Sequence, residues 1–401
     1  MNESIHGMNA STPTSYQIFI STGEVSGDLQ GSLLITSLLR QATKRGYSIQ
    51  ISALGGDRMA AAGATLVGHT SGIGSMGLTE ALPFIFPTWQ VQRRARQFIT
   101  NHPPDLVILI DYANPNLKLG SYLRRTLPHI PIIYYIAPQV WVWDPIASVK
   151  QIIAISDQIL SIFPEEFNYI KAHGGNVKWI GHPLVDTLRN APNRKQARAQ
   201  LDIEPDEVAV ALFPASRHQE LRSLLPVMLA AAKQIQMQIP QVRFWIPLSL
   251  PTFRRPIEQA LLHAGISAQL IEGHTQTLIA AADLAITKSG TVNLEIALLN
   301  VPQVVFYKVS SLTFWLVRRL LNFSIPFMSP VNLVEMRSIV PEFSQEQATS
   351  DAIAAKAISL LTQPTERQQI LEGYTSLRIA LGEPGVCDRA ANIILDFLAK
   401  P

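Results

Sequence analysis

The 401 residues are 47% hydrophobic and only 16% charged, which suggests two domains with extensive buried or lipid-facing surface and excludes a disordered chain or a coiled coil. The single cysteine, Cys387, excludes an internal disulfide and a zinc-binding cysteine cluster, and it favours a reducing cytoplasm. Residues 1–200 carry 17 Lys and Arg against 12 Asp and Glu, and residues 201–401 carry 16 against 18. The basic excess of the first half suits an anionic small ligand or membrane surface and is too dilute for a dedicated nucleic-acid binder.

Residues 1–14 are polar and contain no basic residue followed by an apolar run, so they are interpreted as a loose tail and not as a signal peptide. The most apolar later stretches, residues 81–91 and 304–328, are interrupted by prolines or by basic residues. Neither offers the roughly 20 uninterrupted apolar residues of a spanning helix. Any membrane contact is therefore predicted to be peripheral.

Short runs rich in Val and Ile alternate with helix-period segments along the chain, which predicts parallel sheets with crossover helices. The strands of the first half are predicted at residues 16–21, 48–54, 106–110, 132–136, 158–162 and 177–180. A polar stretch at 186–206 is interpreted as a linker. The strands of the second half are predicted at residues 208–213, 242–247, 269–271, 284–287 and 303–306, and the chain then ends in helices.

The pattern predicts an α/β fold of two Rossmann-like, doubly wound domains that face an inter-domain cleft. The predicted bounds are 15–190 for the first domain and 200–380 for the second. A last helix within 381–401 is predicted to pack back on the first domain. Ligand sites are expected at the carboxyl ends of the strands, where open α/β sheets place them.

The first predicted strand runs into the turn 22–28 (TGEVSGD), before a helix expected to begin near residue 29. Gly23 and Gly27 permit a tight turn and close approach to a ligand, and Ser26 and Asp28 are able to cap exposed amides or to bind a hydroxyl. An ordinary turn between strand and helix uses the same residue types, so both interpretations stay open.

Asp111 directly follows the apolar run 106–110. Partial desolvation at such a strand end would raise its pKa toward a value useful to a general base. The alternative is an N-cap for the next helix. Trp141 and Trp143 follow the strand 132–136, where their rings either stack on sugars or fill the core.

In the second half, residues 212–220 (LFPASRHQE) again combine a strand, a turn and a helix start. Arg217 in this turn is suited to neutralising a diphosphate, and the alternative is a solvated arginine beside Glu220.

The most specific local signal is the stretch 287–295 (TKSGTVNLE), directly after another predicted strand. Gly290 and Thr291 would offer backbone and hydroxyl donors to a phosphate, and Glu295 lies one turn further, where it is able to accept both hydroxyls of a ribose. A nucleotide-sugar donor requires such an arrangement, and an ordinary capped helix is the lesser interpretation.

Together, ten segments in register resemble the lipid-A-disaccharide synthase family over about residues 17–395. These segments are TGEVSGD (22–28), GGDRM (55–59), SMG (75–77), DYANPN (111–116), YIAPQVWVW (135–143), FPEE (163–166), GHP (181–183), PASR (214–217), SGTVNLE (289–295) and VPEFSQ (340–345).

The resemblance implies an inverting glycosyltransferase of the two-domain GT-B type that acts in lipid A biosynthesis. The implied donor is UDP-2,3-diacylglucosamine, and the implied acceptor is 2,3-diacylglucosamine 1-phosphate (lipid X). The products would be a β(1→6)-linked disaccharide 1-phosphate and UDP, with no metal and no cofactor. The implied location is the cytoplasmic face of the inner membrane.

By the same resemblance, Asp111 is the candidate base that removes the proton from the 6-hydroxyl of the acceptor. The implied substrate-binding residues of the first half are Gly23, Glu24, Ser26, Gly27, Asp28, Met76, Asn116 and Trp141. Those of the second half, which would hold UDP, are Ser216, Arg217, Ser289, Gly290, Thr291, Glu295 and Asn332.

Two positions depart from the family pattern. Asn114 replaces the usual second carboxylate near Asp111, and Ala215 replaces the usual glycine before Ser216, where a Cβ matters if the turn needs a positive φ. Within 76–98, apolar residues from Met76 to Trp89 precede Arg93, Arg94 and Arg96. Such a mixture suits either an interfacial element for acyl chains or core packing.

Two other function classes stay open at this point. One is another GT-B enzyme that acts on a UDP-sugar, such as a lipid-linked glycosyltransferase or a UDP-sugar epimerase. The other is a non-catalytic protein that binds nucleotides or lipids. The presence of Asp111, Arg217 and Glu295 argues against the non-catalytic class.

Overall fold

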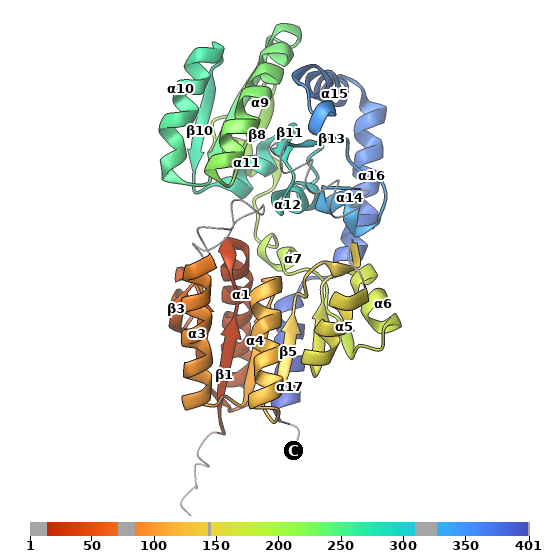
Figure 1. Ribbon diagram of the computed structural model, residues 1–401. Coiled ribbons are helices and arrows are strands. Elements are labelled where there is room, and N and C mark those ends of the chain that lie inside the picture. Colours follow the sequence, from red (N-terminus) through yellow and green to blue (C-terminus); the bar gives the residue numbers. More distant parts are fainter. Residues whose placement is uncertain (1–13, 71–84, 143–145, 309–326, 400–401) are drawn as a thin grey trace, which may run out of the picture. The chain divides into compact units, whose positions relative to one another are not determined.

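The computed structural model describes residues 14–70, 85–142, 146–308 and 327–399. The family segment 75–77, which contains Met76, and Trp143 therefore lie outside the described residues. The chain forms two compact units, shown in Figure 1. Unit 1 comprises residues 1–162, 166–180 and 385–401, and unit 2 comprises residues 163–165 and 181–384.

Unit 1 is built on a seven-stranded parallel sheet in the order β3-β2-β1-β4-β5-β6-β7. Its strands are β1 (Ser15–Ser21), β2 (Ser48–Gly55), β3 (Thr65–His69), β4 (Leu106–Ile110), β5 (Ile132–Tyr135), β6 (Gln158–Ser161) and β7 (Val177–Trp179). All five residues of β4 are buried, because a central strand of a parallel sheet is covered by helices on both faces.

The helices of unit 1 are α1 (Glu24–Lys44), α2 (Asp57–Ala61), α3 (Ile85–Asn101), α4 (Ala113–Thr126), α5 (Ile146–Ile155), α6 (Pro164–Ala172) and α17 (Val386–Leu398), with the short 3-10 helix η2 (Val140–Val142). Helix α17 comes from the end of the chain and packs against α1. Arg45 on α1 pairs with Asp396 on α17 at 2.6 Å, and Arg40 pairs with Asp388. The last helix is thus part of unit 1 (Figure 1).

Unit 2 is built on a six-stranded parallel sheet in the order β10-β9-β8-β11-β12-β13. Its strands are β8 (Val208–Phe213), β9 (Val242–Leu248), β10 (Ala268–Glu272), β11 (Leu284–Lys288), β12 (Gln303–Tyr307) and β13 (Glu342–Ser344). Its helices are α7 (Leu184–Thr187), α8 (Arg194–Gln200), α9 (His218–Gln238), α10 (Arg254–Ala264), α11 (Thr275–Ala281), α12 (Val292–Leu298), α14 (Pro330–Val334), α15 (Ser350–Thr362) and α16 (Pro364–Leu381), with the 3-10 helices η3 (Pro251–Phe253) and η4 (Gln345–Gln347).

The predicted fold class of two parallel-sheet α/β units is confirmed, and every strand predicted from the sequence is present. The sequence analysis missed β3 and β13. Strand β3 lies at the sheet edge and is only half-buried, and β13 has three residues, so neither shows the apolar run that marks the other strands.

The stretch 186–206, interpreted as a linker, lies inside unit 2 and contains helix α8. Asn193 and Gln196 form a capping box at its start. Arg194 pairs with Asp283 at 2.6 Å, and the buried Arg198 donates to the carbonyl oxygen of Glu207 at 2.7 Å. The polar residues that indicated a linker are therefore the caps and ion pairs of a packed helix.

In each unit the strand order reverses between two adjacent central strands. This switch point lies between β1 and β4 in unit 1 and between β8 and β11 in unit 2. Crevices outside such switch points are where doubly wound sheets bind ligands. The turns that follow these four strands, together with the first turns of the next helices, contain most of the site residues expected from the sequence.

Candidate active site

At the switch point of unit 1, the backbone of Asp111 is fixed by its neighbours. Its amide donates to the carbonyl oxygen of Ile136 at 2.9 Å. Its carbonyl oxygen accepts from the Tyr134 hydroxyl at 2.9 Å and from the Asn116 side-chain amide at 2.8 Å. These hydrogen bonds hold the backbone of Asp111, and so the point where its side chain begins, in a fixed position.

Four residues around this switch point adopt the left-handed backbone region that non-glycine residues seldom occupy. They are Glu24 (φ 62°), Asp111 (φ 42°), Tyr112 (φ 51°) and Ile136 (φ 59°). Each such residue costs about 1–3 kcal/mol, and the cost for β-branched Ile136 is at the upper end. Strain concentrated in turns after three adjacent strands is typical of a functional site.

Asp111 is an exposed residue, yet the pKa of its carboxyl group is raised to about 6. Desolvation by the surrounding protein is the larger cause, the nearby Glu24 carboxylate adds to it, and a backbone hydrogen bond from Tyr112 opposes it. A carboxylate with a pKa near neutrality is suited to accept a proton from a substrate hydroxyl.

The two glycines of the first turn are required by packing against the protein itself. A Cβ on Gly23 would lie 2.4 Å from the ring of Tyr112, and a Cβ on Gly27 would lie 2.0 Å from the Thr22 hydroxyl oxygen. Burial raises the pKa of the Tyr112 phenol, and the neighbouring Thr88 side chain on α3 opposes this shift. Tyr112 thus joins the β1–α1 turn, the β4–α4 turn and helix α3.

Helix α1 begins at Glu24, five residues before the start expected from the sequence, so the residues expected in a loop lie in its first turns. Asp28 is buried and accepts from the amides of Gly56 at 2.8 Å and Met59 at 3.1 Å. It therefore caps helix α2, and its predicted role in substrate binding stays a prediction. Ser26 is exposed, as the sequence interpretation requires.

Asn116 is fully buried and organises the strand ends. Its Oδ1 accepts from the Ser21 hydroxyl at 2.7 Å, and its Nδ2 donates to the carbonyl oxygens of Ile110 at 3.0 Å and Asp111 at 2.8 Å. It holds β1 and β4 in register beside Asp111. Trp141 lies half-buried on η2.

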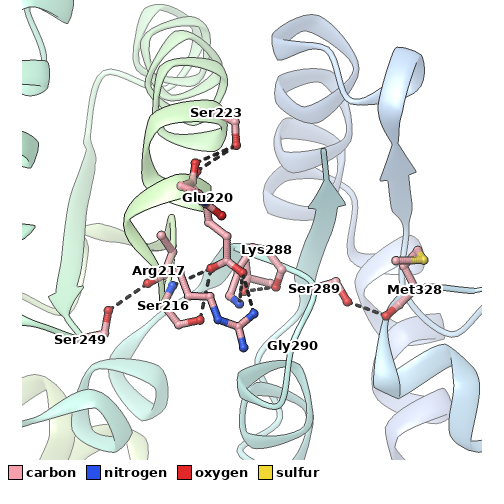
Figure 2. A network of polar contacts seen from close by, with 12 residues as sticks. Ser216, Arg217, Glu220, Ser223, Ser249, Lys288, Ser289, Gly290 and Met328 are labelled. Carbon is pink, nitrogen blue, oxygen red and sulfur yellow. Dashed lines mark hydrogen bonds and ion pairs between the residues drawn. The ribbon is translucent and has the colours of Figure 1, made fainter. Parts of the chain in front are cut away.

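At the switch point of unit 2, a single carboxylate gathers the polar groups of two turns (Figure 2). Oε2 of Glu220 accepts from the Ser216 amide at 2.9 Å and from its hydroxyl at 3.2 Å. Oε1 of Glu220 lies 3.1 Å from the Lys288 ammonium and 3.8 Å from the Arg217 guanidinium. The β8–α9 and β11–α12 turns are thereby joined through Glu220.

The second of these turns carries the Ser-Gly-Thr segment. The Ser289 hydroxyl donates to the Met328 carbonyl oxygen at 2.5 Å, and the Gly290 amide donates to the Asn293 side chain at 2.8 Å. Thr291 is exposed, and Glu295 is half-buried in the first turn of α12. The hydrogen bonds of Ser289 and Gly290 thus hold the shape of this turn.

Asn332 is fully buried, and its side chain closes the loop before β13. Its Oδ1 accepts from the amides of Ile339 at 2.8 Å and Val340 at 2.9 Å, and its Nδ2 donates to Glu342 at 3.1 Å. These contacts give the asparagine a structural task in unit 2. Ala215, which departs from the family pattern, is not among the described residues with positive φ, so its Cβ fits the turn without strain.

Three residues that the sequence analysis did not assign contribute to these sites: Tyr112, Glu220 and Lys288. The sequence carried a signal for two of them, because Lys288 precedes the Ser-Gly-Thr segment at a strand end and Glu220 follows Ser216 by one helical turn. The position of Tyr112 depends on a left-handed backbone that no sequence pattern announces.

Within the described ranges, no helix is long and apolar enough to cross a membrane. Over the same ranges, no group of three or more His, Cys, Asp and Glu side chains is placed to hold a metal ion.

Comparison with known proteins supplies the family. Residues 18–397 match the family described as "Lipid-A-disaccharide synthetase". The lipid-A-disaccharide synthase of Gloeothece citriformis is 52% identical over 383 residues, which cover 95% of this chain and 100% of that protein. The enzyme of the same name from Synechocystis sp. is 52% identical over 384 residues, covering 95% and 98%.

Solved structures with low identity share the fold. UDP-GlcNAc 2-epimerase from Neisseria meningitidis, solved with UDP-GlcNAc bound, has a TM-score of 0.62 at 13% identity and covers 97% of this chain and 100% of that one. The calicheamicin glycosyltransferase CalG4 has a TM-score of 0.57 at 14% identity, covering 96% and 99%. Because the family match extends over nearly the whole chain, the chain belongs to the lipid-A-disaccharide synthetase family.

Proposed function

We propose that this chain joins UDP-2,3-diacylglucosamine to 2,3-diacylglucosamine 1-phosphate, giving a β(1→6)-linked disaccharide 1-phosphate and UDP. As a member of its family the chain is a glycosyltransferase that forms the lipid A disaccharide. The identities of the two acylated substrates are the further step that we propose.

Asp111 is the base in this proposal, and its raised pKa on a strained, rigid turn is the observation that carries the assignment. Its carboxylate removes the proton from the 6-hydroxyl of the acceptor. The oxygen then forms a bond to C1 of the donor sugar as the bond from C1 to the diphosphate breaks. The proton stays on Asp111, and the electron pair of the broken bond leaves with UDP. Because the oxygen attacks from the face opposite to UDP, the configuration at C1 is inverted.

We assign the UDP of the donor to unit 2, with Arg217 and the Ser289-Gly290-Thr291 turn at the phosphates and Glu295 at the ribose. Support comes from the cationic side chains at this switch point and from the exposure of Thr291 at the start of α12. The epimerase of N. meningitidis, which shares the fold, was solved with a UDP-sugar. Unit 1, which contains Asp111, would take the acceptor.

We also propose that helix α3 contacts the membrane from which the acylated substrates come, on the cytoplasmic face of the inner membrane. Phe86 is 63% exposed, Trp89 is 54% exposed, and their rings stack with centroids 6.0 Å apart. Arg93 lies over the Trp89 ring at 5.6 Å. Exposed aromatic rings beside an arginine suit an interface between acyl chains and anionic headgroups.

The test is a reaction of the purified chain with both acylated substrates in detergent micelles, without added metal. Mass spectrometry should detect a tetra-acyl disaccharide 1-phosphate, and UDP should be released in equal amount. Reactions that lack either substrate serve as controls. Absence of the disaccharide, with the protein folded by circular dichroism, would overturn the proposal.

A further inference from the structure

We propose that Lys288 is a donor-binding residue whose ammonium moves from the Glu220 carboxylate to the diphosphate of the UDP-sugar. This inference rests on the proposed function of unit 2 as the UDP-binding unit. It adds a residue that the sequence analysis left without a role.

The place of Lys288 puts its ammonium at the turn where the phosphates are proposed to bind. Lys288 is the last residue of β11, and its side chain is only 10% exposed. Its Nζ lies 3.5 Å from the point that a Cβ on Gly290 would occupy. The ammonium therefore lies beside the Ser-Gly-Thr turn and not on the outer surface of the unit.

The hydrogen bonds of Lys288 leave capacity for an anion. A lysine ammonium has three N–H donors. Among the described residues, Glu220 is its hydrogen-bond acceptor, at 3.1 Å (Figure 2). The same carboxylate also accepts twice from Ser216 and lies 3.8 Å from Arg217, so one anion is shared by two cations. A diphosphate would supply the acceptors and the negative charge that this cluster is able to take up.

A purely structural role explains this arrangement less well. A buried ion pair gains little over packed apolar side chains, because desolvation offsets the attraction between the charges. Burial indeed lowers the pKa of Lys288, and the Glu220 carboxylate opposes this shift. Lys288 lies beside the turn where the phosphates are proposed to bind, and it uses one of its three donors on Glu220. An incoming anion that replaces this contact explains the arrangement better.

The experiment compares UDP with uridine, because the two ligands differ in the diphosphate. Isothermal titration of the wild-type chain, K288M, K288R and K356M measures both affinities. K288M should bind UDP about tenfold to a hundredfold more weakly, with uridine affinity changed by less than about twofold. K288R keeps the charge and should retain most of the UDP affinity.

Lys356 is the matched control, since it forms a lysine–glutamate ion pair with Glu366 in the same unit, between α15 and α16. K356M should leave both affinities unchanged. Equal losses for UDP and uridine in K288M, or a loss of UDP affinity in K356M as large as in K288M, would show a structural effect and overturn the inference. UDP affinity unchanged in K288M would overturn it as well.

If K288M does not fold, E220Q decides. Glutamine keeps an acceptor for the Ser216 amide and removes the charge that competes for Lys288, so UDP should bind at least about threefold more tightly. Unchanged or weaker binding would count against the inference. A wild-type chain that binds no UDP and forms no disaccharide would instead contradict the proposed function, so the two failures are distinguishable.

Discussion

The two units place side chains of opposite charge at the same topological position. In unit 1 the turns after β1 and β4 present the carboxylates of Glu24 and Asp111. In unit 2 the turns after β8 and β11 present the cationic groups of Arg217 and Lys288 around one carboxylate. The same type of parallel sheet therefore supplies two sites of different chemistry. One is suited to accepting a proton, and the other is suited to holding an anion.

The units also differ in how their turns are kept in place. Around Asp111 the backbone itself is strained, with four non-glycine residues at positive φ. Around Lys288 the backbone is ordinary: a hydrogen bond to Glu220 joins the two segments, and the Asn293 side chain holds the β11–α12 turn. The comparison indicates that the proton-accepting site depends on rigid backbone geometry, whereas the anion site depends on side chains that are able to exchange partners.

Replacing Asp111 by asparagine is the strongest test of this division. Turnover of D111N should fall by about a hundredfold or more, because the proton acceptor is lost, while UDP affinity should stay within about twofold. Single-turnover rates and calorimetry measure the two effects separately. N114A is the matched control, since Asn114 is exposed in the same turn, and it should keep near-normal turnover. Near-normal turnover of D111N would remove Asp111 from the base role.

Glu295→Ala tests the other half of the comparison. UDP should bind about tenfold more weakly, because a carboxylate that accepts from ribose hydroxyls is removed, while the pH dependence set by Asp111 should not change. Calorimetry with UDP, and with the deoxyribose analogue dUDP as a second ligand, checks this. Unchanged UDP affinity would place the ribose contact elsewhere.

The pH dependence of turnover should follow the ionisation of Asp111 in unit 1. Asp111 acts as a base only when it is ionised, so kcat/KM should rise with pH through about 6 and fall about tenfold one unit below that value. A profile that is flat between about pH 5 and pH 8 would contradict the assignment, and the UDP affinity of the same protein provides the comparison.

The raised pKa of Asp111 also affects the free energy of unfolding: ionisation, which activates the base, lowers the stability of the folded chain. Since the folded-state pKa of about 6 exceeds the ordinary value of 3.8, ionisation of Asp111 destabilises the folded chain above about pH 6. D111N should therefore unfold at higher denaturant concentration than the wild type at about pH 8, and the difference should disappear as pH falls below about 4. Equal midpoints at both pH values would contradict this.

Gly23→Ala should give the smallest effect. Its Cβ would meet the Tyr112 ring at 2.4 Å, so the variant should lose about 1–2 kcal/mol of unfolding free energy. Denaturant unfolding of G23A and of the double variant G23A/Y112A measures the coupling. If Tyr112 is the obstacle, the double variant should recover part of the loss, and the absence of any coupling would show that the turn relaxes in another way.

Periodic apolar runs sufficed to predict the central strands, because buried parallel strands consist almost entirely of Val, Ile and Leu. Edge strands β3 and β13 lack such runs, and the polar caps of α8 resemble a linker until Asp283 is seen beside Arg194. Residue types also predicted Asp111 and Arg217 at strand ends. The hydrogen bond between Asn116 and Ser21 joins residues far apart in the sequence, so no local pattern announces this structural contact.

Helix α17 imposes an order on the synthesis of this protein. Domains generally fold as units, the N-terminal one first, as the chain leaves the ribosome. Unit 1 cannot do so completely, because α1 must wait for α17, whose buried residues include Ala390 and Ile394 near the end of the chain. Leu34 and Leu38 of α1 are among the buried residues of that helix. Unit 2 thus has all its residues before unit 1 can close, and the apolar face of α1 stays uncovered until α17 has been synthesised.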